Sequence, residues 1–184
     1  AIANIEGQYA ISSGKLITLS EQQLVDCDKY DYGCGGGYMF NAFKYIIEAG
    51  GIENDTDYPY KGFDDKCIFD AGKVAVKVDS FIHKNDISDE EYTSLLSTLG
   101  PLSVAMNANV LFDYDGGIID LTEEECSSQG LNHGVTAVGY EIVKGKVVLT
   151  VKNSWGKKWG EDGYFRINSR SCGLFKDISS VKIK

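Results

Sequence analysis

The stretch LNHGVTAVGYEIVKGKVVLTVKNSWGKKWGEDGYF, residues 131–165, decides how this chain folds. Small or apolar residues alternate with others through residues 133–141 and 146–152. That period of two is typical of a β-strand with one buried face. Lys144-Gly145, between the two runs, is a turn signal. We therefore predict two antiparallel strands joined by a tight hairpin.

A histidine and an asparagine stand at the same end of this predicted hairpin. His133 begins the first strand, and Asn153 follows the second. A plain two-residue turn would pair Asn153 with Thr136, on the face opposite His133, whereas one extra bulged residue would pair it with Val135 on the same face. Gly139 could supply that bulge. The register therefore decides whether the imidazole and the amide meet.

The meeting of these two side chains would have a chemical consequence. An amide oxygen bound to one ring nitrogen fixes the tautomer and leaves the other nitrogen free to exchange a proton with a nucleophile. Such a pair is two-thirds of a catalytic triad. On the residues alone, a hydrogen-bonded histidine of the core is the commoner explanation for a lone histidine at the start of a strand.

The segments NHGVTAVGY (132–140) and KNSWGKKWGEDGYFRI (152–167) resemble the His and Asn regions of papain-family cysteine proteases, including the cathepsins. The resemblance continues in family order through SEQQLVDCD (20–28), YGCGGGYMFNAF (32–43), YPY (58–60), GPLSV (100–104) and SCGLF (171–175). It covers essentially the whole chain, and its motifs are highly specific. It implies a cathepsin L-like peptidase.

The fold class that the resemblance implies is α+β, a papain-like fold of two lobes. Sequence patterns change from helical to strand-rich near Ile82. We expect a helical lobe over residues 1–82, incomplete at its N-terminus, and an antiparallel, β-barrel-like lobe over residues 83–179. Residues 180–184 would cross back, and the whole would form one peptidase domain.

The resemblance also assigns catalytic roles. His133 would be the base and Asn153 the residue that orients it, while a cysteine thiolate forms an acyl-enzyme with the peptide substrate. In relatives that cysteine lies in a Cys-Trp-Ala-Phe-Ser run immediately before the position of Ala1, so we expect it to be absent here and the chain alone to be inactive. The alternative is an inactive papain-like homologue that binds peptides or a protein partner.

Substrate contacts are implied at positions that match the family's binding loops and subsites: Gly36, Gly37, Tyr38, Met39, Ala105, Leu131, Asn132, Trp155 and Asp177. Met39, Ala105, Leu131 and Asp177 match the pocket for the second residue before the scissile bond, which predicts a preference for Leu or Phe. Asp177 either pairs with a substrate Arg or points to solvent. Trp155 would shield the His–Asn hydrogen bond, as in the family.

Five cysteines lie at Cys27, Cys34, Cys67, Cys126 and Cys172, without the spacing of a zinc site. The odd number leaves one sulfur without a partner, and the spacing alone leaves the pairing open. The resemblance selects Cys27–Cys67 and Cys126–Cys172, with Cys34 left over. Disulfides imply an oxidising compartment, so we expect a lysosomal, vacuolar or secreted location.

Composition narrows the partners. A chain of 184 residues with 43% hydrophobic content can bury a core, and no apolar run approaches the length of a membrane span. A net charge of −9, without a basic stripe, argues against nucleic acid. We expect a monomer that acts on polypeptide substrates, with a prosegment or a cystatin-like inhibitor as further partners and no metal or other cofactor.

Helices are predicted at four places. The first residues carry Ile2, Ile5 and Tyr9 at helical spacing, and this pattern stops at Gly14. No capping residue precedes Ala1, so we expect the chain to begin inside a helix and to be a mature or truncated product. Capping boxes at Ser20 and Ser88 predict helices to residues 27 and 99. Residues 38–49 form the fourth. We expect His83 to be solvated and without a role.

Overall fold

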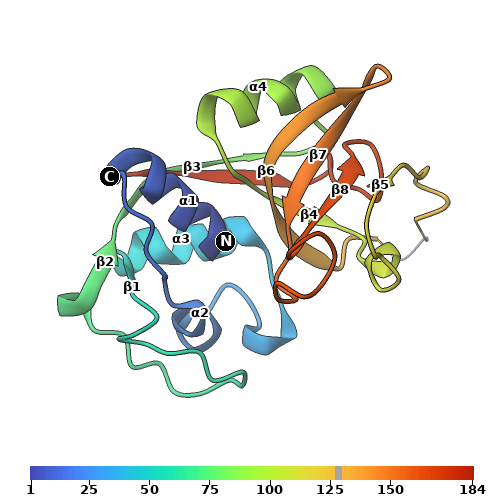
Figure 1. Cartoon of the computed structure of the whole chain (residues 1–184). Coiled ribbons are helices and arrows are strands. Elements are labelled where there is room, and N and C mark those ends of the chain that lie inside the picture. The colour runs from blue at the N-terminus through green and yellow to red at the C-terminus, as the bar shows by residue number, and fades with distance from the viewer. Residues whose placement is uncertain (127–129) are drawn as a thin grey trace. The chain divides into compact units, whose positions relative to one another are not determined.

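The computed structural model describes residues 1–126 and 130–184 (Figure 1). The described chain divides into two compact units: unit 1 contains Ala1–Ile82 and Ser180–Lys184, and unit 2 contains His83–Ser179. Helices and a large sheet are both present, so the predicted α+β class is confirmed. No helix among the described residues is long and apolar enough to cross a membrane.

Unit 1 is built on three α-helices, which the sequence predicted, and on a two-stranded sheet, which it did not. Its elements are α1 (Ile2–Ser13), α2 (Glu21–Cys27), η1 (Gly33–Gly35), α3 (Met39–Ala49), β1 (Ile52–Glu53), η2 (Ala71–Lys73), β2 (Val74–Val76) and most of β3 (Val78–Lys84) and β9 (Ile178–Ile183). The antiparallel pair is β1–β2. The core gathers one face of each helix and includes Ile5, Leu19, Phe43, Ile46 and Ile52, all without exposed surface.

The helix ends in unit 1 follow the residues that the sequence provides. Gly14 ends α1 in the left-handed conformation at φ 73°. Ser20 Oγ accepts the Gln23 N–H at 2.9 Å and begins α2. The expected reciprocal bond of a capping box is absent here, because the Gln23 side chain donates to Gly51 O and accepts from Glu53 N–H instead. Gln23 therefore ties α2 to β1.

Unit 2 is a sheet with one long helix, α4 (Asp89–Leu99). Its other elements are β4 (Leu102–Met106), η3 (Asn109–Leu111), β5 (Ile118–Ile119), β6 (His133–Val143), β7 (Lys146–Lys152) and β8 (Tyr164–Asn168). The strand order is β9-β4-β6-β7-β8-β5, and β3 neighbours β9. The recorded pairings in unit 2 are antiparallel except for the parallel pair β5–β8, so the predicted antiparallel lobe is confirmed as a sheet in which antiparallel pairing dominates.

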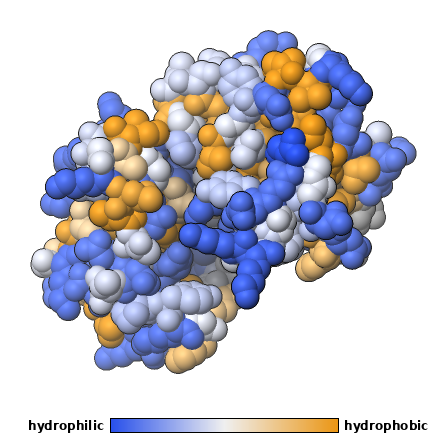
Figure 2. Space-filling view, in the orientation of Figure 1, coloured by the Kyte–Doolittle hydropathy of each residue, from blue (hydrophilic) through white to orange (hydrophobic). Residues whose placement is uncertain are grey.

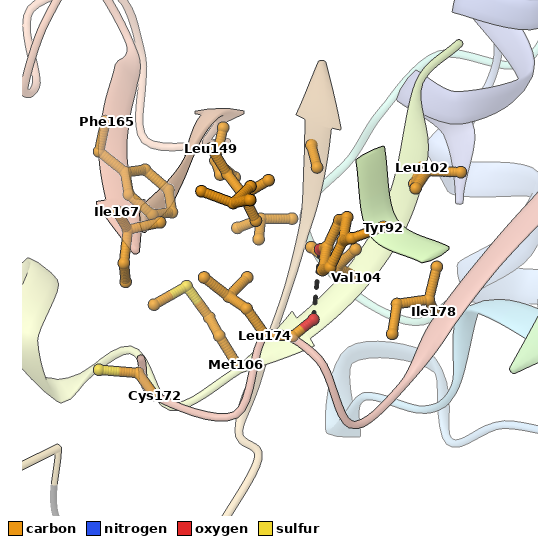
Figure 3. Packing of buried hydrophobic residues seen from close by; sticks show 14 of the residues in the cluster. Tyr92, Leu102, Val104, Met106, Leu149, Phe165, Ile167, Cys172, Leu174 and Ile178 are labelled. Carbon is orange, nitrogen blue, oxygen red and sulfur yellow. Dashed lines mark hydrogen bonds between the residues drawn. The ribbon is translucent and has the colours of Figure 1, made fainter. Parts of the chain in front are cut away.

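The core of unit 2 combines side chains of the strands and of α4 with residues outside these elements such as Leu111, Cys172 and Leu174, and Figure 3 shows part of it. Tyr92 of α4 is fully buried among strand residues such as Val104, Leu149 and Ile178. Its hydroxyl donates to Leu174 O at 3.2 Å, the bond drawn as a dashed line. On the outer side, Figure 2 shows apolar surface over the β6–β7 hairpin.

Both cysteine pairs implied by the resemblance are bonded in the structure. Cys27–Cys67 closes a loop in unit 1, and Cys126–Cys172 closes one in unit 2. Cys34 is a free, exposed thiol.

Candidate active site

The β6–β7 hairpin has the register that the predicted site requires. Lys144 and Gly145 form the turn with φ of 51° and 80°, the positive values of a tight hairpin turn. From that turn to the pair Gly139↔Thr150, each residue of β6 pairs with the next residue of β7 without interruption. The next pair is Ala137↔Val151, so the register shifts by one residue. The extra residue of this bulge is therefore the one before Gly139, not Gly139 itself, and the shift puts Asn153 on the face of His133.

His133 and Asn153 are hydrogen bonded, with His133 Nε2 2.8 Å from Asn153 Oδ1. The same Oδ1 accepts the backbone N–H of Ser154 at 2.8 Å, and because that N–H can only donate, the atom is the amide oxygen. Oδ1 can only accept, so His133 Nε2 carries a proton. In the neutral imidazole Nδ1 is then the basic nitrogen, free to exchange a proton with another group.

Aromatic side chains cover this pair. The Trp155 and His133 ring centroids are 5.3 Å apart, and Trp155 also stacks on Phe112 at 5.4 Å and meets the edge of Trp159 at 5.2 Å. Asn153 is buried, with 8% of its surface exposed. A sheltered hydrogen bond is stronger than one in water, so the covering rings favour a fixed imidazole. Phe112 was missed by the sequence analysis, because its loop carries no periodic pattern.

Asn132, next to His133, has a structural contact of its own. Its Oδ1 accepts the Ala108 N–H at 2.8 Å, and its backbone N–H donates to Met106 O at 3.0 Å. These bonds hold the segment before β6 against the end of β4 and so fix where His133 begins. The role in substrate binding that the resemblance gives to Asn132 stays a prediction.

Three of the four residues predicted for one specificity pocket belong to unit 2. The backbone N–H of Ala105 donates to Asp177 O at 3.1 Å, so these two positions are neighbours. Leu131 is 40% exposed. Asp177 does not point to solvent, because only 8% of it is exposed and its carboxylate lies beside His83. His83 itself, expected to be solvated, has a partner and keeps 26% of its side chain exposed.

The fourth, Met39, lines a cavity of about 200 Å³ in unit 1 together with the other predicted substrate residues of that unit, Gly36, Gly37 and Tyr38. Asp31 anchors this loop, since its Oδ1 accepts the Tyr38 N–H at 3.0 Å. Gly37 is required there, because a Cβ would lie 2.2 Å from Asp31 Cγ. The structure thus gathers these four residues around one hollow.

A buried acid in the same cavity was missed by the sequence analysis. Asp28 is 7% exposed, and its Oδ2 has no hydrogen-bond partner among the described residues. Burial raises the pKa of the Asp28 carboxyl to about 6, and the charge of Asp31 adds to the rise. No signal in the motif around Cys27 distinguishes a buried from a solvated aspartate at this position.

No activated thiol is found among the five cysteines. Four form disulfides, and the pKa of the Cys34 thiol is raised above its usual value by desolvation and by the neighbouring Asp64. A catalytic cysteine requires the opposite shift. Within the described residues, no group of three or more His, Cys, Asp or Glu is placed to hold a metal ion.

A sheltered His–Asn pair with one free ring nitrogen is the arrangement expected of a thiol hydrolase. The model of the papain family cysteine proteases matches residues 1–182. This chain therefore belongs to the papain family of cysteine proteases, and the recognition made from the motifs is confirmed.

Viral cathepsins are among the relatives of this chain. The viral cathepsin of Spodoptera litura multicapsid nucleopolyhedrovirus is 44% identical over 186 residues, which cover 100% of this chain and 54% of that protein. The viral cathepsin of Heliothis zea nuclear polyhedrosis virus is 42% identical over 186 residues, covering 100% of this chain and 49% of the relative. The chain thus spans about half the length of the relatives it matches.

Solved structures agree on the papain-like fold. Digestive procathepsin L2 from the larval midgut of Tenebrio molitor matches with a TM-score of 0.89 at 35% identity, over 98% of this chain and 58% of that one. The bromelain protease from Ananas comosus, in complex with the E64 inhibitor, matches with a TM-score of 0.85 at 35% identity, over 100% of this chain and 86% of that one.

Proposed function

We propose that the protein containing this chain is an endopeptidase of the papain type, with His133 as its acid–base group and Asn153 as the residue that orients it. The observation that carries the proposal is the 2.8 Å bond from His133 Nε2 to Asn153 Oδ1. It leaves Nδ1 as the nitrogen that exchanges protons, and family membership supports the reaction class.

The reaction follows from that protonation state. Nδ1 takes the proton of a cysteine thiol, and the thiolate attacks the carbonyl carbon of the peptide to form a C–S bond. The resulting imidazolium returns the proton to the leaving amine as the C–N bond breaks. Water then hydrolyses the thioester with the imidazole again acting as base. Asn153 stabilises the charged ring at each stage, because Nε2–H continues to donate to Oδ1.

The nucleophile in this proposal is a cysteine outside these 184 residues. Two observations support it: four cysteines are held in disulfides, and the raised pKa of Cys34 disfavours its thiolate. The relatives extend well beyond the matched region, to about twice its length. On this proposal the chain alone has no peptidase activity.

Substrate binding is proposed for the residues around the unit 1 cavity, Gly36, Gly37, Tyr38 and Met39, and for Ala105, Leu131, Asn132, Trp155 and Asp177 of unit 2. Polypeptides would be the substrates. We further propose a prosegment or a cystatin-like inhibitor as a partner. The two disulfides support a lysosomal, vacuolar or secreted location.

The experiment is labelling of the full-length protein with the epoxide inhibitor E64, followed by mass spectrometry to find the modified residue. We expect one labelled cysteine outside these 184 residues, and loss of labelling and of peptide hydrolysis in His133→Ala. Cys34→Ser is the matched control and should keep both.

Labelling at Cys34 would overturn the assignment of the nucleophile. A folded full-length protein that binds peptides but neither hydrolyses them nor reacts with E64 would instead support the alternative, a papain-like binding module.

A further inference from the structure

The turn after β1 contains Asn54-Asp55-Thr56, an Asn-Xaa-Thr triplet whose middle residue is not proline. Such triplets accept N-linked glycans on the surface loops of secreted proteins, and this is the one example in the sequence. Triplets of this kind also arise by chance, and a buried one cannot carry a bulky glycan. The surroundings of Asn54 therefore decide whether the motif is a modification site.

The backbone of this turn is well anchored. Asn54 forms an isolated β-bridge with Leu19, and its carbonyl accepts the N–H groups of Asp57 and Tyr58, each at 3.1 Å. Tyr58 is fully buried and holds the far end of the turn. Because the backbone is held on both sides, the direction in which the Asn54 side chain leaves the turn is fixed as well.

The Asn54 side chain itself is open to solvent. Its amide forms no hydrogen bond with a described residue, and neither of its polar atoms is among the buried ones that lack a partner. An amide that is neither bonded to the protein nor buried is accessible to an enzyme. Thr56, whose hydroxyl completes the acceptor motif, is exposed.

A glycan on Asn54 would leave the unit 1 cavity uncovered. Helix α3 begins at this cavity, which Met39 lines, and ends next to β1. Its 11 residues separate these two ends by about 16 Å. Helix α2 runs in the opposite sense: Ser20 at its start donates its N–H to Glu53 O at 3.0 Å, and Asp28 after its end lines the cavity. Both helices thus place Asn54 at the end of unit 1 away from the cavity.

We propose that Asn54 is an N-glycosylation site of the full-length protein, with a lipid-linked oligosaccharide of the secretory pathway as donor. The amide nitrogen of Asn54 forms a bond to C1 of the first sugar and loses a proton. The bond from C1 to the lipid pyrophosphate breaks, and the lipid pyrophosphate leaves. The inference rests on the proposed lysosomal, vacuolar or secreted location, which the two disulfides support.

The experiment is peptide mapping of the full-length protein, produced in insect cells with a signal peptide and purified from the medium. Peptide N-glycosidase in heavy-oxygen water converts a glycosylated asparagine to labelled aspartate, so the mass of the peptide that contains Asn54 reports the modification directly. We expect this conversion in the wild type. Thr56→Ala removes the hydroxyl of the motif and should abolish the conversion, whereas Thr56→Ser, the matched control, should keep it.

An unmodified Asn54 peptide in the secreted wild type would overturn the proposal, as would conversion that persists in Thr56→Ala. The readout does not depend on catalysis. A protein that is glycosylated at Asn54 but not labelled by E64 would therefore support this proposal and count against the proposed function. Where E64 does label the protein, the wild type and Thr56→Ala should react at equal rates, and a slower reaction of the glycosylated form would overturn the placement of the glycan away from the cavity.

Discussion

Asn153→Ala tests the orienting role of the amide most directly. The substitution removes the acceptor that lies 2.8 Å from His133 Nε2 and leaves the ring free to change tautomer and rotate. Hydrogen bonds to a charged group contribute about 1.5–3 kcal/mol. In the proposed mechanism this bond is made to an imidazolium, and Trp155 lies against the His133 ring. If that energy is lost in the transition state, kcat/KM falls by roughly 10- to 150-fold.

The assay is kcat/KM of the full-length protein on a fluorogenic peptide, with two further variants. Asn153→Asp keeps the size and the acceptor oxygen, so it should lose less activity than the alanine variant. Asn168→Ala removes a buried asparagine of β8 whose side chain donates to Asp120 at 2.8 Å, and so reports the cost of losing any buried amide. It should lower stability while leaving kcat/KM near the wild-type value.

Two results would refute this reasoning. If Asn153→Ala keeps kcat/KM within about twofold of the wild type, the hydrogen bond does not orient the base. If the aspartate and alanine variants lose equal activity, the acceptor oxygen is not what matters, and packing beneath Trp155 is the better explanation.

Three further predictions concern stability. Tyr92→Phe should lower the free energy of unfolding by about 1 kcal/mol in urea denaturation, because the Leu174 carbonyl loses its buried donor. Replacing both Cys27 and Cys67 by Ser should cost about 4 kcal/mol by the same measurement, since their separation of 40 residues closes a long loop. Burial raises the pKa of the Asp28 carboxyl to about 6, so the stability that Asp28 contributes is present at pH 4 and is lost as the pH rises through 6. Asp28→Asn should therefore reduce the fall in Tm between pH 4 and 6. An unchanged dependence of Tm on pH in this variant would refute the prediction.

The sequence predicted most of the local structure because the signals were local. Ser20 and Ser88 begin their helices by accepting the N–H three residues on, and Gly14 and Gly50 end helices in the left-handed conformation. For the capping box at Ser20, the bond from the Gln23 N–H to Ser20 Oγ forms, but the reciprocal bond from the Gln23 side chain does not. Gln23 finds buried backbone partners. A competing tertiary contact thus displaced the local bond.

The hairpin shows how far pattern reasoning extends toward the site. Alternation predicted both strands, but it left two registers for Asn153, one on each face. The structure resolves the choice with a bulge between Ala137 and Gly139. The added residue, Val138, is 38% exposed, so it costs the core little. Whether His133 has its partner therefore depends on one inserted residue that periodicity alone does not locate.

His83 and Asp177 lay beyond any local pattern, because they are far apart in sequence and meet through neighbouring strands, β3 and β9. The polar neighbours Lys84 and Asn85 favoured a solvated histidine, and His83 is indeed an exposed residue. Its side chain nevertheless lies beside the buried Asp177 carboxylate.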